Sequence, residues 1–221
     1  MLKHTNIFFD FDGTLSDTSD GVFKSFDYVA DFYGISLADK SIYKTMIGPP
    51  LLESFTRVFG FTADTLPQAM AKYREYYTAK GMFECRIYDG VIDLIKELRK
   101  GGKRILVATS KPEVYARQIL EKKGILDLFD FVGGSDLEEA VRVNKVDIIR
   151  YVMQNLNIQD TSSCLMIGDT HFDIQGAQKA GIESLGILWG FGSEQSLRSA
   201  GATYIAKTPL DVQKLILGES A

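Results

Sequence analysis

The chain has 221 residues, of which 45% are apolar and 24% charged, and it carries a formal net charge of −4. This composition supplies a core for one large domain or a main domain with an insertion, and the negative balance argues against a nucleic acid polymer as a partner. No apolar run is long enough to cross a membrane and no signal-peptide pattern begins the chain, so we expect a cytoplasmic protein with no membrane association.

The first predicted element is a short apolar run at residues 7–11, and similar runs recur in the second half of the chain. They are almost continuously apolar instead of alternating, which is typical of parallel strands covered on both faces. The runs that we predict as strands are residues 7–11, 104–110, 129–135, 163–169, 184–190 and 202–206.

The segment after the first strand breaks this pattern. Residues 15–84 contain no convincing buried strand, and their apolar spacing predicts helices over 21–34, 50–58 and 66–80. We therefore expect residues 15–84 to form a helical cap domain inserted after the first strand, at the carboxyl edge of a sheet, where ligands bind in open α/β folds. Residues 1–14 and 85–221 are expected to form the core domain.

Helical patterns separate the later strands. They cover residues 91–102, 112–124, 144–157 and 173–181, and glycine follows or ends three of them. Strands that alternate with helices predict an α/β fold with a doubly wound parallel sheet, that is, a Rossmann-like core.

Chemically active residues stand at the ends of four predicted elements. They lie in DFDGT (residues 10–14), TSKP (109–112), a lysine at the start of a helix (Lys145) and GDTHFD (168–173). Because the carboxyl ends of parallel strands share one edge of the sheet, we expect these groups to converge. Carboxylates so close together need a cation, and oxygen ligands without thiolates or paired histidines indicate Mg²⁺.

The four motifs in this order resemble the signature of the haloacid dehalogenase superfamily, on its phosphatase side. The resemblance covers nearly the whole chain, because residues 15–84 are similar to the small mobile cap of that family. Within the superfamily the chain is similar to phosphoglycolate phosphatases, and segments such as IGPPLLESF and GILWGFGSEQSL resemble bacterial phosphatases or 5′-nucleotidases. The resemblance implies a Mg²⁺-dependent phosphomonoester hydrolase that acts on small phosphorylated metabolites through an aspartyl-phosphate.

The resemblance also implies the role of each catalytic residue. Asp10 is the nucleophile and a Mg²⁺ ligand. Asp12 is the general acid and base, and its backbone carbonyl is a further Mg²⁺ ligand. Lys145 neutralises the nucleophile and the phosphate, so it belongs to both the catalytic and the phosphate-binding sets.

The remaining motif residues are assigned to the phosphate and the metal in the same way. Gly13 and Ser110 offer backbone N–H groups to the phosphate, and Thr109 offers its hydroxyl. Asp169 is a Mg²⁺ ligand, and Asp173 either belongs to the metal site or orients Lys145. Outside this set, we expect His4 at the surface and no catalytic role for His171.

Two alternatives stay open. A sugar phosphotransferase or mutase of the β-phosphoglucomutase type has the same core, and no residue decides whether the phosphoryl group passes to water or to a sugar hydroxyl. The second alternative is a non-catalytic phosphate-ligand binding protein, and the complete set of catalytic motifs disfavours it. The resemblance also disfavours a dehalogenase, because such enzymes need no acid or base at the position of Asp12 and no metal-binding carboxylate at the position of Asp169. It disfavours a phosphonatase because the sites of those enzymes lack the second aspartate. A monomer is expected, with a dimer left open.

Overall fold

The computed structural model describes residues 1–137 and 140–218 of the chain. These residues divide into two compact units. The first unit consists of Met1–Ser16 and Ile87–Ala221, and the second is Asp17–Arg86. The second unit is therefore an insertion within the first.

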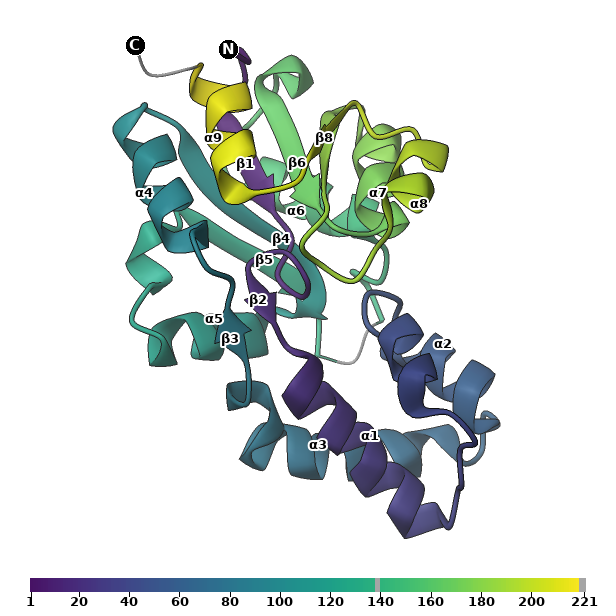
Figure 1. Cartoon of the computed structure of the whole chain (residues 1–221). Helices are drawn as coiled ribbons and strands as arrows, with labels where there is room; N and C mark the ends of the chain where they lie inside the picture. Colours follow the sequence, from purple (N-terminus) through teal and green to yellow (C-terminus); the bar gives the residue numbers. More distant parts are fainter. Residues whose placement is uncertain (138–139, 219–221) are drawn as a thin grey trace. The chain divides into compact units, whose positions relative to one another are not determined.

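The first unit is built on a six-stranded sheet in the order β5-β4-β1-β6-β7-β8 (Figure 1). Every neighbouring pair is parallel. The strands are β1 (Asn6–Phe9), β4 (Arg104–Pro112), β5 (Phe131–Ser135), β6 (Cys164–Gly168), β7 (Glu183–Ile187) and β8 (Tyr204–Ala206). All six predicted strands are confirmed. From β1 the chain adds β4 and β5 on one side of the sheet and then β6, β7 and β8 on the other, so β1 is the topological switch point.

Helices cover both faces of this sheet. They are α4 (Val91–Lys100), α5 (Glu113–Lys122), α6 (Lys145–Asn155), α7 (His171–Ala180), α8 (Glu194–Ser199) and α9 (Pro209–Leu217), with two 3-10 turns at Leu126–Leu128 and Thr161–Ser163. Helices α4 and α9 pack together on one face, and α6 and α7 pack together on the other (Figure 1). The predicted α/β fold is confirmed, while α8 and α9 are elements that were not predicted from the sequence.

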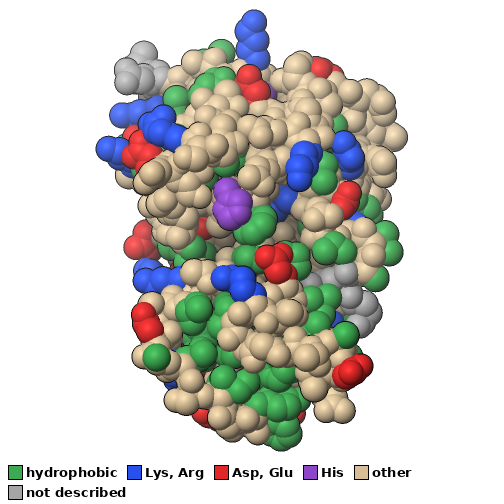
Figure 2. Space-filling view, turned by 90° about the vertical axis from the view of Figure 1, so that its right-hand side faces the viewer, with side chains coloured by type: hydrophobic (Ala, Val, Ile, Leu, Met, Phe, Trp, Pro, Cys, Tyr) green, Lys and Arg blue, Asp and Glu red, His purple; other side chains and the backbone are tan. Residues whose placement is uncertain are grey.

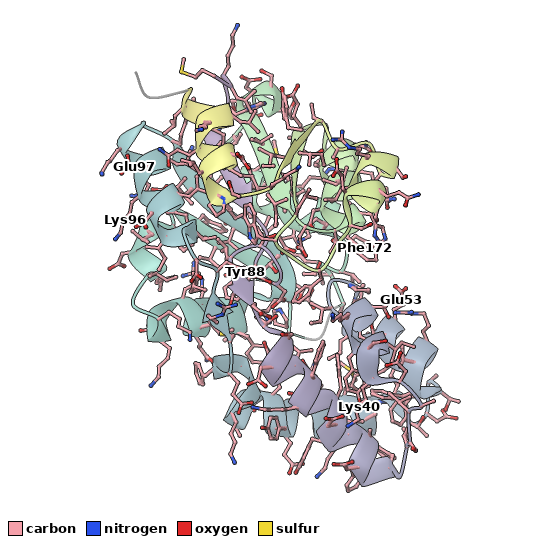
Figure 3. The ribbon with its side chains drawn as sticks, viewed as in Figure 1. Lys40, Glu53, Tyr88, Lys96, Glu97 and Phe172 are labelled. Carbon is pink, nitrogen blue, oxygen red and sulfur yellow. The ribbon has the colours of Figure 1, made fainter. Side chains whose placement is uncertain are left out.

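The helices pack through one apolar stripe each, as the sequence spacing requires. In α4, Val91, Leu94 and Leu98 are buried, and Lys96 and Glu97 point outward (Figure 3). On the opposite face the core joins side chains of α6 to alternate side chains of the strands. This cluster contains Phe8, Leu106, Ala108, Ile148, Ile149, Val152, Met166 and Ala177. Such burial, worth about 25 cal/mol per Å² of apolar surface, holds the sheet edge rigid beneath the site.

The second unit is helical. Its elements are α1 (Ser19–Tyr33), a 3-10 helix (Lys40–Met46), α2 (Leu51–Ser54), a π-helical segment (Phe55–Phe59), α3 (Leu66–Ala79) and a 3-10 turn (Gly81–Phe83). Its core is aromatic: the Phe26 ring lies within 6.2 Å, centroid to centroid, of the rings of Tyr43, Phe55, Phe59 and Tyr73. The edge-to-face and tilted contacts among these rings are favourable beyond the area that they bury.

The chain passes between the two units at two neighbouring points. Strands β2 (Ser16–Asp17) and β3 (Arg86–Ile87) form a small two-stranded sheet that contains both crossings. Each strand has only two residues, which is too short for a hydrophobic pattern to reveal. The sequence therefore carries no visible signal for this connection.

The surface carries charges of both signs. Figure 2 shows Lys and Arg side chains interspersed with Asp and Glu over the face in view. Within the described parts of the chain, no helix combines the length and the apolar character needed to cross a bilayer.

Candidate active site

The candidate site lies where three central strands end. Asp10 follows β1 directly, and its N–H donates to the carbonyl of Ile167 at 2.9 Å, which continues the β1–β6 ladder by one residue. Asp169 follows β6 in the same way. Thr109 is in the last part of β4, the other neighbour of β1. The switch point of the sheet thus brings these motif residues together.

Three carboxylates form the centre of the site. One oxygen each from Asp10, Asp169 and Asp173 lies within 4.8 Å of the other two, and all three residues are buried. Asp169 is held at both oxygens: the Thr14 hydroxyl donates to Oδ1 at 3.1 Å, and the Phe191 N–H donates to Oδ2 at 2.7 Å. The first helix turn of α7 brings Asp173 to the same point.

Lys145 supplies a cation to this cluster. Its Nζ lies 2.7 Å from Asp10 Oδ1 and 2.8 Å from Asp173 Oδ1, and it donates to the carbonyl of Ala108 at 3.0 Å. Lys145 begins α6 and is 5% exposed. The predicted helix-start lysine is therefore a buried ion-pair partner rather than a solvated residue.

Asp173 also has a structural task. Its Oδ2 accepts from the N–H and hydroxyl of Thr170, at 3.0 and 2.9 Å, and this pair forms a capping box at the start of α7. Since Oδ1 lies against Lys145, both oxygens of Asp173 have partners within the protein. This arrangement favours the orienting role that the sequence left open for Asp173.

Burial of these charges shifts their titration. Desolvation, followed by repulsion from Asp173, raises the pKa of Asp10 to about 7 despite the nearby Lys145. Desolvation and the neighbouring Asp173 and Asp10 also raise the pKa of Asp169 well above its usual range. Burial lowers the pKa of Lys145, but the adjacent Asp10 and Asp173 carboxylates outweigh this, so its pKa is raised. Without a metal, burial therefore disfavours the ionised forms of Asp10 and Asp169.

The donor set suits a divalent cation. The buried cluster offers carboxylate oxygens from Asp10, Asp169 and Asp173, with the Lys145 ammonium against two of them. When all four groups are ionised, Lys145 compensates one of the three negative charges and leaves two. Hard oxygen ligands with this excess of charge match Mg²⁺.

Asp12 is not a member of the group of three clustered carboxylates. Its Oδ1 lies 3.0 Å from Nζ of Lys111, and the two side chains are 16% and 5% exposed. The Asp12 carboxylate thus lies against a different lysine from the one that pairs with Asp10 and Asp173. Lys111 lies within the TSKP motif, but no role was predicted for it from the sequence.

The predicted phosphate-binding residues lie at the same edge. Thr109 is 1% exposed, and its hydroxyl oxygen accepts from the N–H of Lys111 at 3.2 Å. Ser110 adjoins it in β4. The N–H of Gly13 donates to the carbonyl of Ser16 at 2.9 Å, so binding of phosphate by this group would require that bond to open.

A comparison with models of protein families identifies the family of this chain. The family model of haloacid dehalogenase-like hydrolases matches residues 7–187 of the chain. The chain belongs to this family. The superfamily resemblance seen in the motifs is confirmed, and the chain is a phosphatase of the haloacid dehalogenase type.

Individual relatives span most of this haloacid dehalogenase-like hydrolase. A 5′-nucleotidase of Pseudomonas aeruginosa is 36% identical over 203 residues, covering 92% of this chain and 91% of its own. A protein of Mycobacterium tuberculosis named tyrosine-protein kinase PtkA is 31% identical over 199 residues, which cover 90% of this chain and 67% of that protein. The crystal structure of a predicted phosphatase from Clostridium acetobutylicum has a TM-score of 0.92 at 40% identity, covering 99% of this chain and 100% of its own.

One segment of the hydrolase site was not predicted from the sequence. The loop after β7 covers Asp169: the Trp189 indole N–H donates to the carbonyl of Thr14 at 3.1 Å, and the Phe191 N–H binds Asp169. Between them, a Cβ on Gly190 would come within 2.4 Å of Asp169 Oδ2 and 2.3 Å of the Gly13 carbonyl. The WGFG sequence contributes to the resemblance, but its contact with Asp169 depends on the fold.

Gly190→Ala is expected to displace Asp169 and to destabilise the protein by about 1–3 kcal/mol, the usual cost of forcing an extra methyl group into a packed site. Chemical denaturation measures the loss, and titration calorimetry with Mg²⁺ is expected to show weaker binding.

Gly102→Ala is the control for this prediction. Its φ of +74° makes alanine unfavourable, so this variant also loses stability, but its methyl group meets nothing within 4 Å and should leave Mg²⁺ binding unchanged. Unchanged Mg²⁺ binding by Gly190→Ala would show that the loop does not position Asp169.

Proposed function

We propose that this protein is a Mg²⁺-dependent phosphomonoester hydrolase that works through an aspartyl-phosphate on Asp10. The observation that carries the proposal is the Lys145 ammonium between Asp10 and Asp173, beside the third buried carboxylate of Asp169. Asp10, Asp169 and the Asp12 backbone carbonyl would hold Mg²⁺, with Asp173 beside them. When bound, the metal supplies positive charge that lets an anionic phosphate approach Asp10.

In the first step a carboxylate oxygen of Asp10 attacks phosphorus. The bond between phosphorus and the ester oxygen breaks, and the proton of the Asp12 carboxyl goes to the departing alcohol. Lys145 offsets the charge of Asp10 and of the transferring phosphoryl group. The products of this step are the free alcohol and an acyl phosphate on Asp10.

In the second step water attacks the same phosphorus. Asp12, now ionised, takes a proton from that water, and the bond between phosphorus and the Asp10 oxygen breaks. Inorganic phosphate leaves, and both aspartates return to their starting state. The Thr109 hydroxyl and the backbone N–H of Ser110 hold phosphate oxygens in both steps, and Gly13 provides the sharp turn after Asp12, with φ of +79°.

We further propose a nucleoside 5′-monophosphate as the substrate class, ahead of phosphoglycolate. The similarity to a 5′-nucleotidase over nine-tenths of both chains supports this choice. The helical unit Asp17–Arg86 is the cap in this proposal, and its side chains select the alcohol part of the ester.

A phosphotransferase is the second candidate. The specific observation in its favour is the relative named a tyrosine-protein kinase, which is 31% identical over 90% of this chain. The two functions share the first step, and they differ in whether water or another hydroxyl accepts the phosphoryl group from Asp10.

Phosphate release from a panel of esters tests the proposal. The panel contains nucleoside 5′-monophosphates, phosphoglycolate, hexose phosphates and an aryl phosphate, each with Mg²⁺ and with a chelator. We expect Mg²⁺-dependent release that is fastest with a nucleoside monophosphate. Release of the alcohol without inorganic phosphate, when a hydroxyl acceptor is present, would instead support phosphotransfer, and no turnover at all would reject both.

A further inference from the structure

A second buried lysine stands beside the general acid and base. The Lys111 ammonium lies 3.0 Å from Asp12 Oδ1 and 5.6 Å from the centroid of the Phe11 ring. The Lys111 side chain is only 5% exposed. A buried lysine normally needs a specific partner to offset the loss of hydration, and here a partner is the carboxylate proposed to carry the proton.

The course of the backbone directs Lys111 toward Asp12. Strand β4 changes register against β5 between Thr109 and Pro112, so this segment departs from the regular ladder. The Lys111 N–H donates to the Thr109 hydroxyl at 3.2 Å. Because β4 is paired with β1 up to Phe9 and Val107, this irregular segment projects Lys111 toward the residues that follow β1.

The two buried lysines pair with different carboxylates. Lys145 forms ion pairs with Asp10 and Asp173, the nucleophile and its neighbour, whereas Lys111 forms an ion pair with Asp12. The cluster of Asp10, Asp169 and Asp173 that would hold the metal is thus compensated by Lys145. We therefore expect removal of Lys111 to leave the metal site intact.

We propose that Lys111 is a positioning residue that fixes the Asp12 carboxylate in the orientation for proton exchange, first with the leaving group and then with water. This inference rests on the proposed function, in which Asp12 is the acid and base. A carboxyl group that is held at one oxygen is already oriented for reaction, so the entropy of orienting it is not lost again in each turnover. Displacement of a catalytic group by about 1 Å can cost roughly 10²-fold in rate.

Lys111→Met tests the proposal, because it keeps an unbranched side chain of nearly the same length and removes the charge. We expect kcat to fall about 10- to 100-fold, whereas KM and the Mg²⁺ dissociation constant from calorimetry stay within about threefold. The loss should be larger for a nucleoside monophosphate than for an aryl phosphate, since an aryl oxide leaves with less help from an acid.

A double-mutant cycle with Asp12→Asn shows whether Lys111 acts through Asp12. In the Asp12→Asn background, measured with the aryl phosphate at high enzyme concentration, Lys111→Met should reduce the residual rate by less than about threefold. Lys111→Arg keeps a cation and is expected to recover part of the activity. If Lys111→Met does not fold, Lys111→Gln takes its place in the cycle.

Lys103→Met is the matched control. Lys103 is a half-buried lysine of the same unit whose Nζ donates to the carbonyl of His4 at 2.7 Å, and its loss should leave kcat unchanged. The positioning role would be overturned if Lys111→Met caused the same loss in the wild-type and Asp12→Asn backgrounds, the same loss with both leaving groups, or a loss confined to KM. Near-normal turnover by Asp12→Asn alone would overturn the acid and base assignment itself, before Lys111 is changed.

Discussion

Replacing Asp10 with Asn is expected to lower turnover by at least about 10³-fold and, at the same time, to stabilise the metal-free protein. Turnover falls because an amide cannot form the acyl phosphate through which the proposed reaction proceeds. The geometry of the pocket should be preserved, since Asn has the same size and can still accept a hydrogen bond from Lys145.

The gain in stability follows from the pKa of Asp10. Burial and Asp173 raise this pKa to about 7, so the folded state binds more protons than the unfolded state between about pH 4 and 7. The stability of the metal-free wild type should therefore fall as pH rises through this range. The pKa of about 7 already includes the attraction of Lys145, so Asp10→Asn removes the whole of that loss, and we expect a net gain of about 2–4 kcal/mol above pH 7 that disappears below about pH 4.

Thermal unfolding in a chelator at pH 5 and pH 8, together with steady-state turnover in Mg²⁺, measures both effects. Asp127→Asn is the control, because Asp127 is an exposed aspartate of the same unit. A variant that keeps substantial turnover would exclude Asp10 as the nucleophile. A variant that is less stable than wild type at pH 8 without metal would show that the site tolerates its negative charge.

The sheet was predictable because its strands are buried on both faces. Runs such as residues 104–110 and 163–169 are apolar without a break, and in a chain with alternating helices this pattern is typical of buried parallel strands. Helix α9 was missed although a signal exists: Thr208 and Asp211 form a capping box around Pro209 at its first position. The two-residue strands β2 and β3 leave no pattern to read.

The site was predictable only as far as its motifs are local. Asp10 and Asp12 are recognisable at the end of one strand, whereas the partners of Asp169 come from Thr14 and Phe191, which are distant in sequence. His4 illustrates the same limit. We expected it at the surface, and this was wrong: it is 5% exposed, and its Nε2 lies 3.0 Å from Glu183 Oε2. Nothing near His4 in sequence reveals that partner.

Replacing Lys145 with Met is expected to destabilise the protein by about 3–5 kcal/mol near neutral pH, the usual cost of leaving a buried charge without its partner. The change deprives Asp10 and Asp173 of their ammonium group and leaves the Ala108 carbonyl without this donor. Turnover should fall by about 10²-fold or more, because the transferring phosphoryl group loses a fixed positive charge.

The pH dependence of this loss identifies its cause. The pKa of Lys145 is raised in the folded state, so the lysine stays charged, and its contribution stays present, throughout the range below its usual pKa. The group that titrates below pH 8 is the Asp10 carboxyl, whose pKa is raised to about 7. In Lys145→Met the pKa of Asp10 should be higher still, because Lys145 lowers it in the wild type, so the destabilisation should be largest at pH 8 and smaller at pH 5.

Urea denaturation at both pH values, with and without Mg²⁺, measures this difference. The cation should restore part of the stability of Lys145→Met at pH 8, because it offsets the same carboxylates. Lys103→Met, which removes a lysine that donates to the His4 carbonyl, should show neither the pH dependence nor the recovery. A loss of stability that is equal at pH 5 and pH 8 would mean that Lys145 stabilises the protein by packing. The positive charge of Lys145 would then not contribute to stability through the carboxylate cluster.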